Sequence, residues 1–333
     1  MNLMKRNCLH QFLVATTILT ILSLPICSCV KQEADAEESG RIEDRVSVFF
    51  SIEGEPRTTK AESLQCLDVL VFRTESGRID SHLKASGSVF SVKVPKDIPV
   101  QWFIIANAPS DAFNNVKSLS DFNEEFSHLS DNTAASPCMS ASGQTVFTQQ
   151  SSQTATLYRL ISRVYVGTIQ NDYYEPTSFT VRRVFLLNAV EGLSFDAKRL
   201  SGFWYNKLVH EPSNTLSCLD TEMNRGSDSP LIEIGQYLYC FPNPTVEDVF
   251  SLTFLEWSPR HTRIVIEASV NGATEYYPIT LPVMKRNTTY QLNKVIITGP
   301  GTAHPDTPIE REAIISTITI LPWEYTELQA PLE

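Results

Sequence analysis

Residues 46–53 read Val46-Ser47-Val48-Phe49-Phe50-Ser51-Ile52-Glu53. Apolar side chains occupy every second position, at Val46, Val48, Phe50 and Ile52. Successive side chains of a strand point to opposite faces of a sheet, so a period of two predicts a strand with one buried face. This stretch therefore predicts the first strand of a β-rich fold.

Alternation of the same kind recurs along the rest of the chain. It predicts strands at residues 67–73, 89–94, 100–106, 156–169, 179–189, 231–241, 250–256, 263–270, 290–298 and 314–321. Asn271-Gly272 separates two alternating runs, and this dipeptide favours a two-residue hairpin turn. Only residues 116–129 show the spacing of an amphipathic helix. Many short strands at regular spacing predict an all-β protein with two tandem β-sandwich domains.

A change of composition suggests where these two domains meet. Residues 130–154 are rich in Ser, Thr, Gln and Asn. The domain boundary is placed at the end of this polar segment. The amino-terminal sandwich is then predicted at residues 46–154 and the carboxyl-terminal sandwich at 155–333.

Composition and charge limit the possible partners. The 333 residues include 42% hydrophobic and 20% charged residues, and the formal net charge is −11. These values exclude a disordered chain and a polytopic membrane protein. A strong acidic excess also argues against nucleic acid as the main partner, because a phosphate binder needs a basic face.

The amino terminus resembles that of a bacterial lipoprotein. Lys5 and Arg6 precede an apolar run that ends in Ile26-Cys27-Ser28-Cys29. This predicts a lipoprotein signal peptide at residues 1–28, with Cys29 acylated and bound to outer-membrane lipid. Residues 29–45 are polar and acidic, which predicts a flexible tether resembling the cell-surface sorting signal of Bacteroidetes lipoproteins. The alternative is an ordinary cleaved signal peptide.

The search for catalytic, metal or cofactor chemistry finds no candidate residues. Six histidines, at positions 10, 82, 128, 210, 261 and 304, lie far apart in the sequence and match no metal-binding motif. The segment Gly299-Pro300-Gly301-Thr302 lacks the lysine of a phosphate loop and predicts a turn. Four cysteines follow Cys29, an even number that is compatible with disulfides: Cys66, Cys138, Cys218 and Cys240. Cys240 lies in an apolar strand and is predicted to be a buried thiol.

The carboxyl-terminal third carries the most specific motifs. Met284-Lys285-Arg286-Asn287-Thr288-Thr289-Tyr290, the block from Lys294 to Thr302, Pro305-Asp306-Thr307-Pro308 and a last apolar strand ending in Trp323 resemble the Bacteroidetes fimbrillins. Upstream, Leu157-Tyr158-Arg159-Leu160-Ile161-Ser162-Arg163-Val164 and Cys138-Met139-Ser140 resemble further family segments. The stretch from Val46 to Arg57 resembles the family's first strand and its processing arginine.

The resemblance implies two transthyretin-like sandwiches and a mechanism of assembly. Fimbrillins are pilus subunits made as lipoproteins, and an Arg-specific protease cuts each one after an arginine near its first strand. Here the cut would fall between Arg57 and Thr58. The strand with Val46, Val48, Phe50 and Ile52 would then leave, and the groove would accept a strand from another subunit. The donor strand implied for this chain carries Ile314, Ile318, Ile320 and Trp323.

Other interpretations remain open from the sequence. Residues 46–53 could form a permanent edge strand, and cleavage could fall at nearby Arg41, Arg45 or Lys60. The tail 324–333 is acidic, and Pro331 interrupts its alternation, which departs from the pattern of a donor strand. The protein would be a stalk or tip subunit of a cell-surface fimbrium. The alternatives are a lipid-anchored pilus anchor that keeps its first strand, and a non-polymerising adhesin for a host protein or glycan. In the adhesin, Trp204, Tyr205, Tyr276 and Tyr277 would be exposed.

Overall fold

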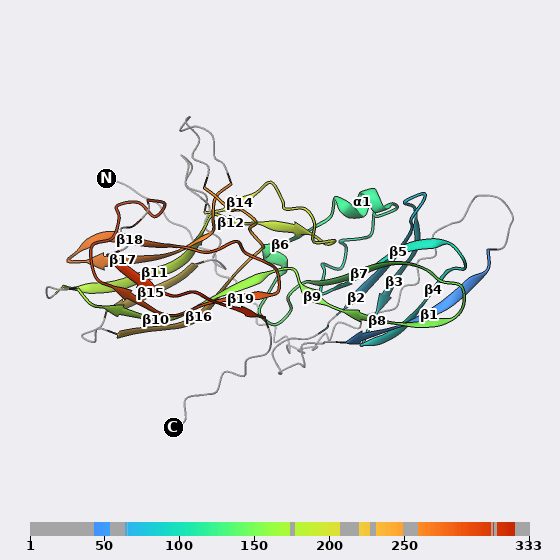
Figure 1. Ribbon diagram of the computed structural model, residues 1–333, viewed down its shortest axis with the longest axis horizontal. Coiled ribbons are helices and arrows are strands. Elements are labelled where there is room, and N and C mark those ends of the chain that lie inside the picture. Colours follow the sequence, from blue (N-terminus) through green and yellow to red (C-terminus); the bar gives the residue numbers. More distant parts are fainter. Residues whose placement is uncertain are drawn as a thin grey trace, which may run out of the picture.

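The structure is a computed structural model that describes residues 43–53, 64, 66–173, 177–206, 220–226, 231–248, 259–307, 309 and 312–323. Strands make up most of this part of the chain, and two groups of sheets lie end to end along the long axis (Figure 1). The all-β prediction is confirmed. The boundary between residues 154 and 155 stays a prediction.

The strands fall into two sets, the first in the amino-terminal group of sheets and the second in the carboxyl-terminal group. β6 is given with the first set, although it pairs with β13 at the junction of the two groups. The first set is β1 (Arg45–Glu53), β2 (Leu67–Arg73), β3 (Ile79–Ala85), β4 (Val89–Pro95), β5 (Pro99–Ala106), β6 (Phe126–His128), β7 (Met139–Val146), β8 (Ser151–Thr156) and β9 (Tyr158–Arg159). The second set is β10 (Ser162–Asn171), β11 (Phe179–Leu187), β12 (Ala189–Val190), β13 (Gly192–Ser194), β14 (Trp204–Tyr205), β15 (Asp220–Gly226), β16 (Leu231–Cys240), β17 (Arg263–Val270), β18 (Ala273–Thr280), β19 (Thr288–Ile297), β20 (Ile314–Ser316) and β21 (Thr319–Pro322).

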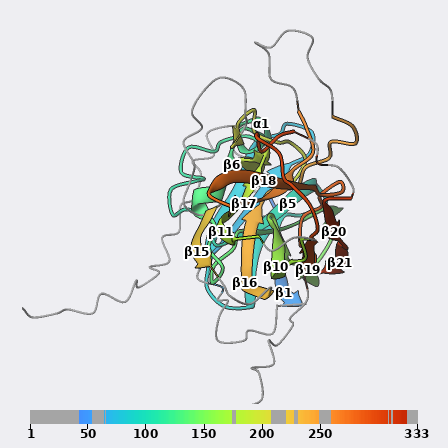
Figure 2. The ribbon, with the colours of Figure 1, turned by 90° about the vertical axis from the view of Figure 1, so that its left-hand side faces the viewer.

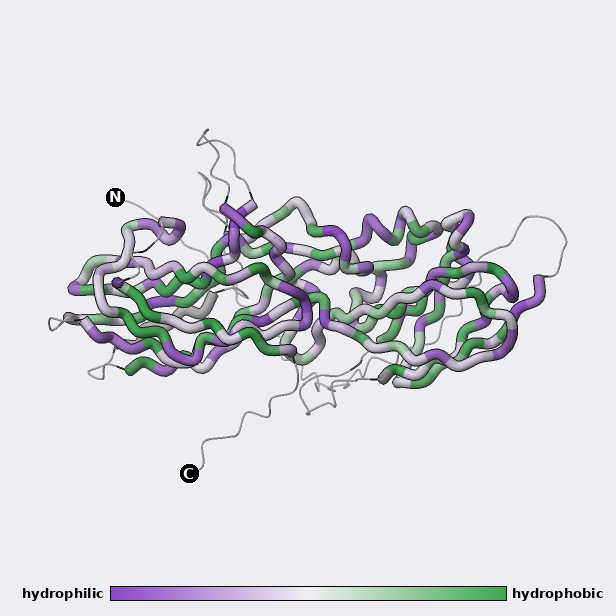
Figure 3. The backbone as a smooth tube through the Cα atoms, viewed as in Figure 1, coloured by the Kyte–Doolittle hydropathy of each residue, from purple (hydrophilic) through white to green (hydrophobic). Residues whose placement is uncertain are grey.

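Two sheets face each other in the amino-terminal group. One has the strand order β4-β1-β8 and the other β3-β2-β5-β7-β9. Alternate residues of β1, β2, β4 and β5 point between the sheets, where they form one hydrophobic cluster with Phe147, Ala155 and Leu157. The period of two read from the sequence therefore corresponds to this buried face, and Figure 3 shows the alternation along the strands.

The other face of the larger sheet is covered by the segment that contains the helix. The amphipathic helix predicted at 116–129 is wrong in its extent, because α1 spans only Leu119–Asn123. Ser118 caps its first turn through a capping box with Asp121. The chain then forms β6 (Phe126–His128), which pairs with β13, and the short 3-10 helix Leu129–Asp131. Sheet pairing at the junction thus replaces the last predicted helical turns.

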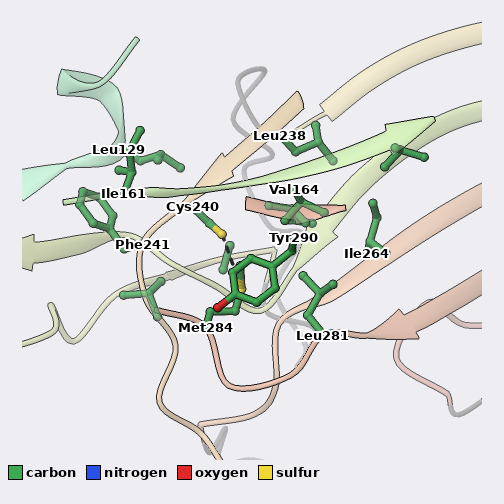
Figure 4. Close-up of a cluster of buried hydrophobic side chains, with 14 of the residues drawn as sticks. Leu129, Ile161, Val164, Leu238, Cys240, Phe241, Ile264, Leu281, Met284 and Tyr290 are labelled. Carbon is green, nitrogen blue, oxygen red and sulfur yellow. Dashed lines mark hydrogen bonds between the residues drawn. The ribbon is translucent and has the colours of Figure 1, made fainter. Parts of the chain in front are cut away.

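The carboxyl-terminal group is a second pair of sheets. One sheet has the order β16-β10-β19-β20, with β21 also paired to β19, and the other has the order β15-β11-β17-β18. Figure 4 shows the core between them, in which Val164, Leu238, Tyr290 and Ile264 pack together. Asn271 and Gly272 turn β17 into β18 with φ angles of 50° and 86°, as their hairpin role requires.

Several strands are absent from the sequence predictions because they are polar. β3, β7, β8 and β15 have few apolar residues. β7 and most of β8 lie within the Ser/Thr-rich segment 130–154, and β8 continues two residues beyond it. Two predicted strands are also divided. Residues 156–169 contain the end of β8, then β9 and most of β10, and residues 314–321 contain β20 and most of β21. The predicted strand at 250–256 lies outside the described residues.

The two groups of sheets meet in one continuous apolar cluster. Phe113 of the amino-terminal group contacts Phe195 with ring centroids 4.9 Å apart. β6 and β13 add a short antiparallel ladder between the groups. The large shared cluster indicates a firm junction rather than a loose linker.

Candidate assembly site

β1 lies in the middle of its sheet. It pairs antiparallel with β4, from Arg45↔Pro95 to Ser51↔Val89, and parallel with β8, from Val48↔Ser151 to Glu53↔Thr156. It is therefore an internal strand and not the edge strand of the alternative interpretation. Its departure would leave two unpaired strand edges that face each other, a site that another strand can fill by backbone hydrogen bonds.

The apolar side chains of β1 are buried in the amino-terminal core. Val48, Phe50 and Ile52 have exposed fractions of 0%, 1% and 7%, and Val46 is half-buried. Phe50 stacks on Phe90 at 5.6 Å and meets Trp102 edge-on at 5.1 Å. The predicted alternation thus faces the core, while the outward-facing Phe49 is 40% exposed.

An ionic cluster fixes the beginning of β1 to the opposite sheet. Arg45 donates to Asp80 of β3 at 2.5 Å and to the carbonyl oxygen of Lys93 at 2.9 Å. Asp80 is almost fully buried and also pairs with Arg73 at 3.1 Å. Arg73 in turn binds Glu43, and this hydrogen bond is the main cause that lowers the pKa of the Glu43 carboxyl.

The residues of the implied donor strand lie in the chain's own carboxyl-terminal sandwich. β20 and β21 pair with β19 and form the outer edge of their sheet, and β19 separates them from β10 (Figure 2). Ile314 and Ile318 are half-buried against the main core, whereas Ile320 is 55% exposed. Thus these residues contact their own sheet in the structure, and their role as a donor stays a prediction.

Trp323 is the most tightly held residue of this segment. Its ring lies under two guanidinium groups, with Arg159 at 4.7 Å and Arg163 at 4.6 Å from the centroid, and Tyr239 packs beside it at 5.9 Å. Its backbone N–H donates to the carbonyl of Asn287 at 2.9 Å, and its carbonyl accepts from Arg159 at 3.1 Å. Cation–π contacts of this kind contribute about 0.5–2 kcal/mol each. The sequence marks Trp323 as the end of a strand but gives no sign of its two arginine partners.

Several predicted site residues lie outside the described part of the chain. These are Cys29, Arg57 and Thr58, as well as Arg41, Lys60, Cys218 and the tail 324–333. Their predicted roles in lipidation, processing and donation stay predictions. Arg45 is the one alternative cleavage residue whose surroundings the structure describes.

Three of the described histidines form hydrogen bonds within the fold through a ring nitrogen, namely His82, His128 and His261. His82 contacts Asp68 at 2.8 Å, and His128 contacts Glu191 at 2.6 Å. In the described ranges, no group of His, Cys, Asp or Glu side chains is placed to hold a metal ion. None of the helices in that part of the chain has the length and apolar character needed to cross a bilayer.

The segment Gly299-Pro300-Gly301-Thr302 is a turn held by the chain's own groups. The N–H of Gly301 donates to the Glu275 carboxylate at 2.7 Å, and Thr302 forms a β-bridge with Tyr276. A Cβ atom at Gly301 would lie 2.7 Å from the carbonyl oxygen of Tyr276. The close approach of the two backbones therefore explains why position 301 is a glycine.

The four aromatic residues considered for adhesion are not a common exposed surface. Tyr277 is fully buried, and its hydroxyl lies 2.6 Å from that of Tyr173 and donates to Glu275 at 2.8 Å. Tyr276 is half-buried, and so are Trp204 and Tyr205, which pack against the main core. The exposed aromatic in this region is Phe203, at 70%, which the sequence pattern did not single out.

The structure confirms Cys240 as a buried thiol and shows that Cys138 is a second one. Burial raises the pKa of Cys138 to about 11 and that of Cys240 to about 12. Cys240 lies near Met284 in the core (Figure 4). Its sulfur is also 3.6 Å from the hydroxyl of Ser162. Neither Cys138 nor Cys240 is part of a disulfide.

Comparisons with known proteins identify related folds. No protein-family model matches the sequence, and no curated protein is significantly similar to it. A solved structure from Bacteroides eggerthii, described as a candidate cell adhesion protein, aligns over 84% of this chain and 97% of its own, with 16% identity and a TM-score of 0.64. A second candidate adhesion protein, from Parabacteroides distasonis, aligns over 85% and 100%, with 15% identity and a TM-score of 0.61.

The same fold occurs in a fimbrial protein. The fimbrilin (fimA) of Porphyromonas gingivalis W83 aligns over 84% of this chain and 98% of its own, with 15% identity and a TM-score of 0.57. These alignments include both groups of sheets, because they cover most of each chain. The protein therefore has the fold of the Bacteroidetes fimbrillins and of the candidate cell adhesion proteins that share it.

Proposed function

We propose that this protein is a structural subunit, stalk or tip, of a cell-surface fimbrium. It is exported as an outer-membrane lipoprotein through Cys29 and assembles by strand exchange after cleavage between Arg57 and Thr58. The observation that carries the proposal is the position of β1, an internal strand whose buried side chains complete the amino-terminal core. The fold shared with a fimbrilin supports it. Its partners are other fimbrial subunits and an Arg-specific protease.

The energetics of β1 favour exchange over spontaneous loss. Burial of Val48, Phe50 and Ile52 contributes roughly 5–9 kcal/mol at about 1.5–3 kcal/mol for each side chain. A strand held this firmly leaves rarely by itself. Cleavage removes its covalent link to β2, and a competing strand with similar side chains then compensates for the lost burial and backbone hydrogen bonds.

The structure around Arg45 favours Arg57 as the processing site. Proteolysis favours exposed loops over strands that are paired within a sheet. Arg45 is bound to Asp80, and the residues that follow it are paired with β4. A cut at Arg45 would also leave β1 joined to β2, whereas a cut after Arg57 separates them.

Processing at Arg57 can be tested with two matched variants. Arg57→Ala removes the proposed site, and Arg45→Lys removes the nearby arginine while keeping a positive charge near Asp80. With an Arg-specific protease, we expect the wild type and Arg45→Lys to acquire Thr58 as the amino terminus and to polymerise. Arg57→Ala is expected to keep β1 and to stay monomeric.

The outcome separates the proposal from its alternatives. Amino-terminal sequencing identifies the cut, and electron microscopy detects the fibres. Normal fibres from Arg57→Ala that still carry β1 would contradict strand exchange. An acylated Cys29 at the amino terminus of the protein within assembled fimbriae would identify an anchor subunit instead.

A further inference from the structure

β8 depends on β1 for its place in the sheet. Among the described strands, β1 is the only ladder partner of β8, through six register pairs that end at Glu53↔Thr156. Ala155 of β8 is also buried against the core that β1 completes. Loss of β1 would therefore leave β8 without any of these backbone hydrogen bonds, and such a strand opens easily.

The end of β8 is close in sequence to the residue that holds Trp323. Leu157 follows β8 directly and is buried in the amino-terminal core. Two residues later, Arg159 is 4% exposed, donates to the carbonyl oxygen of Trp323 and stacks on its ring. Only two residues thus separate Thr156, in the last pair of the β1–β8 ladder, from Arg159, which contacts the carboxyl-terminal strand.

Arg159 is also positioned by a short β-ladder. β9 pairs with β7 through only two register pairs, Met139↔Arg159 and Ser140↔Tyr158. The N–H of Leu160 adds one hydrogen bond to the carbonyl of Cys138 at 2.9 Å. The position of Arg159 is therefore set by β8 on one side and, on the other, by this short ladder and the fully buried Leu160 and Ile161. Its guanidinium also donates to Oδ1 of Asn287 at 3.1 Å.

We infer that the first strand and the carboxyl-terminal strand of one subunit are energetically coupled through β8 and Arg159. While β1 is in place, Arg159 clamps Trp323 and keeps β21 on β19. When β1 leaves, β8 loosens, Arg159 loses its fixed position, and β21 and Trp323 open more often. This inference rests on the proposed function in one respect: cleavage and strand exchange are the event that removes β1. Its consequence is that an unprocessed precursor keeps its carboxyl-terminal strand closed.

Coupling of this kind is reciprocal, which makes it testable in the uncleaved protein. If β1 stabilises the clamp, then loss of the clamp must weaken the β1–β8 ladder by the same free energy. Arg159 and Arg163 both stack on the ring of Trp323, but Arg163 lies in β10, which pairs with β16 and β19, whereas Arg159 follows the end of β8 by three positions. Arg163 therefore supplies a matched control.

The first experiment measures hydrogen exchange by mass spectrometry in the uncleaved chain from residue 30 onward. Arg159→Gln is expected to speed exchange about tenfold or more both at residues 319–323 and at residues 151–156. Arg163→Gln is expected to speed exchange only at 319–323. Arg159→Lys keeps the charge, and its exchange rates are expected to lie between those of Arg159→Gln and those of the wild type. Unchanged exchange at 151–156 in Arg159→Gln would overturn the coupling.

A second experiment removes β1 directly. A specific protease site is inserted after Arg57, and Phe50→Ala weakens β1 so that the cleaved fragment dissociates, which native mass spectrometry verifies. Exchange at 319–323 is expected to rise when the fragment is lost and to fall when a peptide of residues 43–53 is added. If the fragment leaves and the peptide rebinds with no change at 319–323, the coupling is wrong while strand exchange stands. If the fragment stays bound even when an excess of a competing strand peptide is added, the proposed function fails, and the Arg159→Gln experiment still decides the coupling.

Discussion

The indole ring of Trp102 meets the ring of Phe50 edge-on, with centroids 5.1 Å apart, and joins the middle strands of two facing sheets. Phe90 stacks on the same phenyl ring at 5.6 Å. Gly143 makes room for Trp102, because a Cβ at that position would lie 2.4 Å from Cζ2 of the indole. β1 is therefore held at its centre by aromatic packing from both sheets.

Substitution of Phe50 tests this packing. Phe50→Ala should lower the free energy of unfolding of the uncleaved protein by about 3–5 kcal/mol, the usual loss for a buried phenylalanine. Phe50→Asp should cost more, because it also places a carboxylate in an apolar site. Urea unfolding measures both changes. Phe49→Ala, on the exposed face of the same strand, serves as the control and should cost less than about 1.5 kcal/mol.

Phe50→Asp also tests whether β1 is replaced after processing. After cleavage and exchange, residue 50 has left the subunit. The processed variant should then accept a donor strand as the wild type does. A permanent defect in polymerisation after processing would show that β1 is not replaced.

Acylation of Cys29 follows from the sequence at the amino terminus. Cys29→Ala should abolish labelling with palmitate and release the protein from the membrane fraction, because the acyl chains are the predicted anchor. Cys27→Ala, two residues away, is the matched control and should leave labelling unchanged. Continued labelling of Cys29→Ala would place the lipid elsewhere.

The start of β1 should loosen at acid pH. The Arg73 hydrogen bond lowers the pKa of Glu43 below its ordinary value of 4.5. A carboxyl whose pKa is lowered in the folded state contributes stability above its unfolded pKa, and this contribution is lost as the pH falls through the folded pKa. The difference in the free energy of unfolding between wild type and Glu43→Gln should therefore be small but measurable at pH 7 and should vanish once the pH has fallen well below 4.5. If the difference in the free energy of unfolding persisted at that low pH, it would arise from packing and not from the charge of Glu43.

The buried thiols should resist modification in the folded protein. The pKa of Cys138 is raised to about 11 and that of Cys240 to about 12, because burial disfavours the thiolate that reacts with alkylating reagents. At pH 8, iodoacetamide should therefore leave both residues unmodified, and unfolding in urea should make both reactive. Peptide mapping identifies the modified residues. Rapid labelling of either thiol in the folded protein would contradict its placement in the core.

The sequence by itself determined the strands whose alternation is strong. Val46, Val48, Phe50 and Ile52 face one side of β1 in the structure, and β2 and β17 have the bounds that the pattern predicts. The turn at Asn271-Gly272 was equally clear, since the positive φ angles that this dipeptide adopts are a local property. These features depend on residues that are close together in the chain.

Only the tertiary structure decided which strands pair and what each strand end contacts. β1 meets β8 about one hundred residues further along the chain, and β8 is polar enough that its sequence alone predicts no strand. The clamp on Trp323 likewise joins Arg159 of β9 to the last described residue of the chain, 164 positions away. The helix predicted at 116–129 is shorter because β13 pairs with residues 126–128. Such outcomes depend on which distant surfaces meet, and the alternation within a single strand carries no information about its partners.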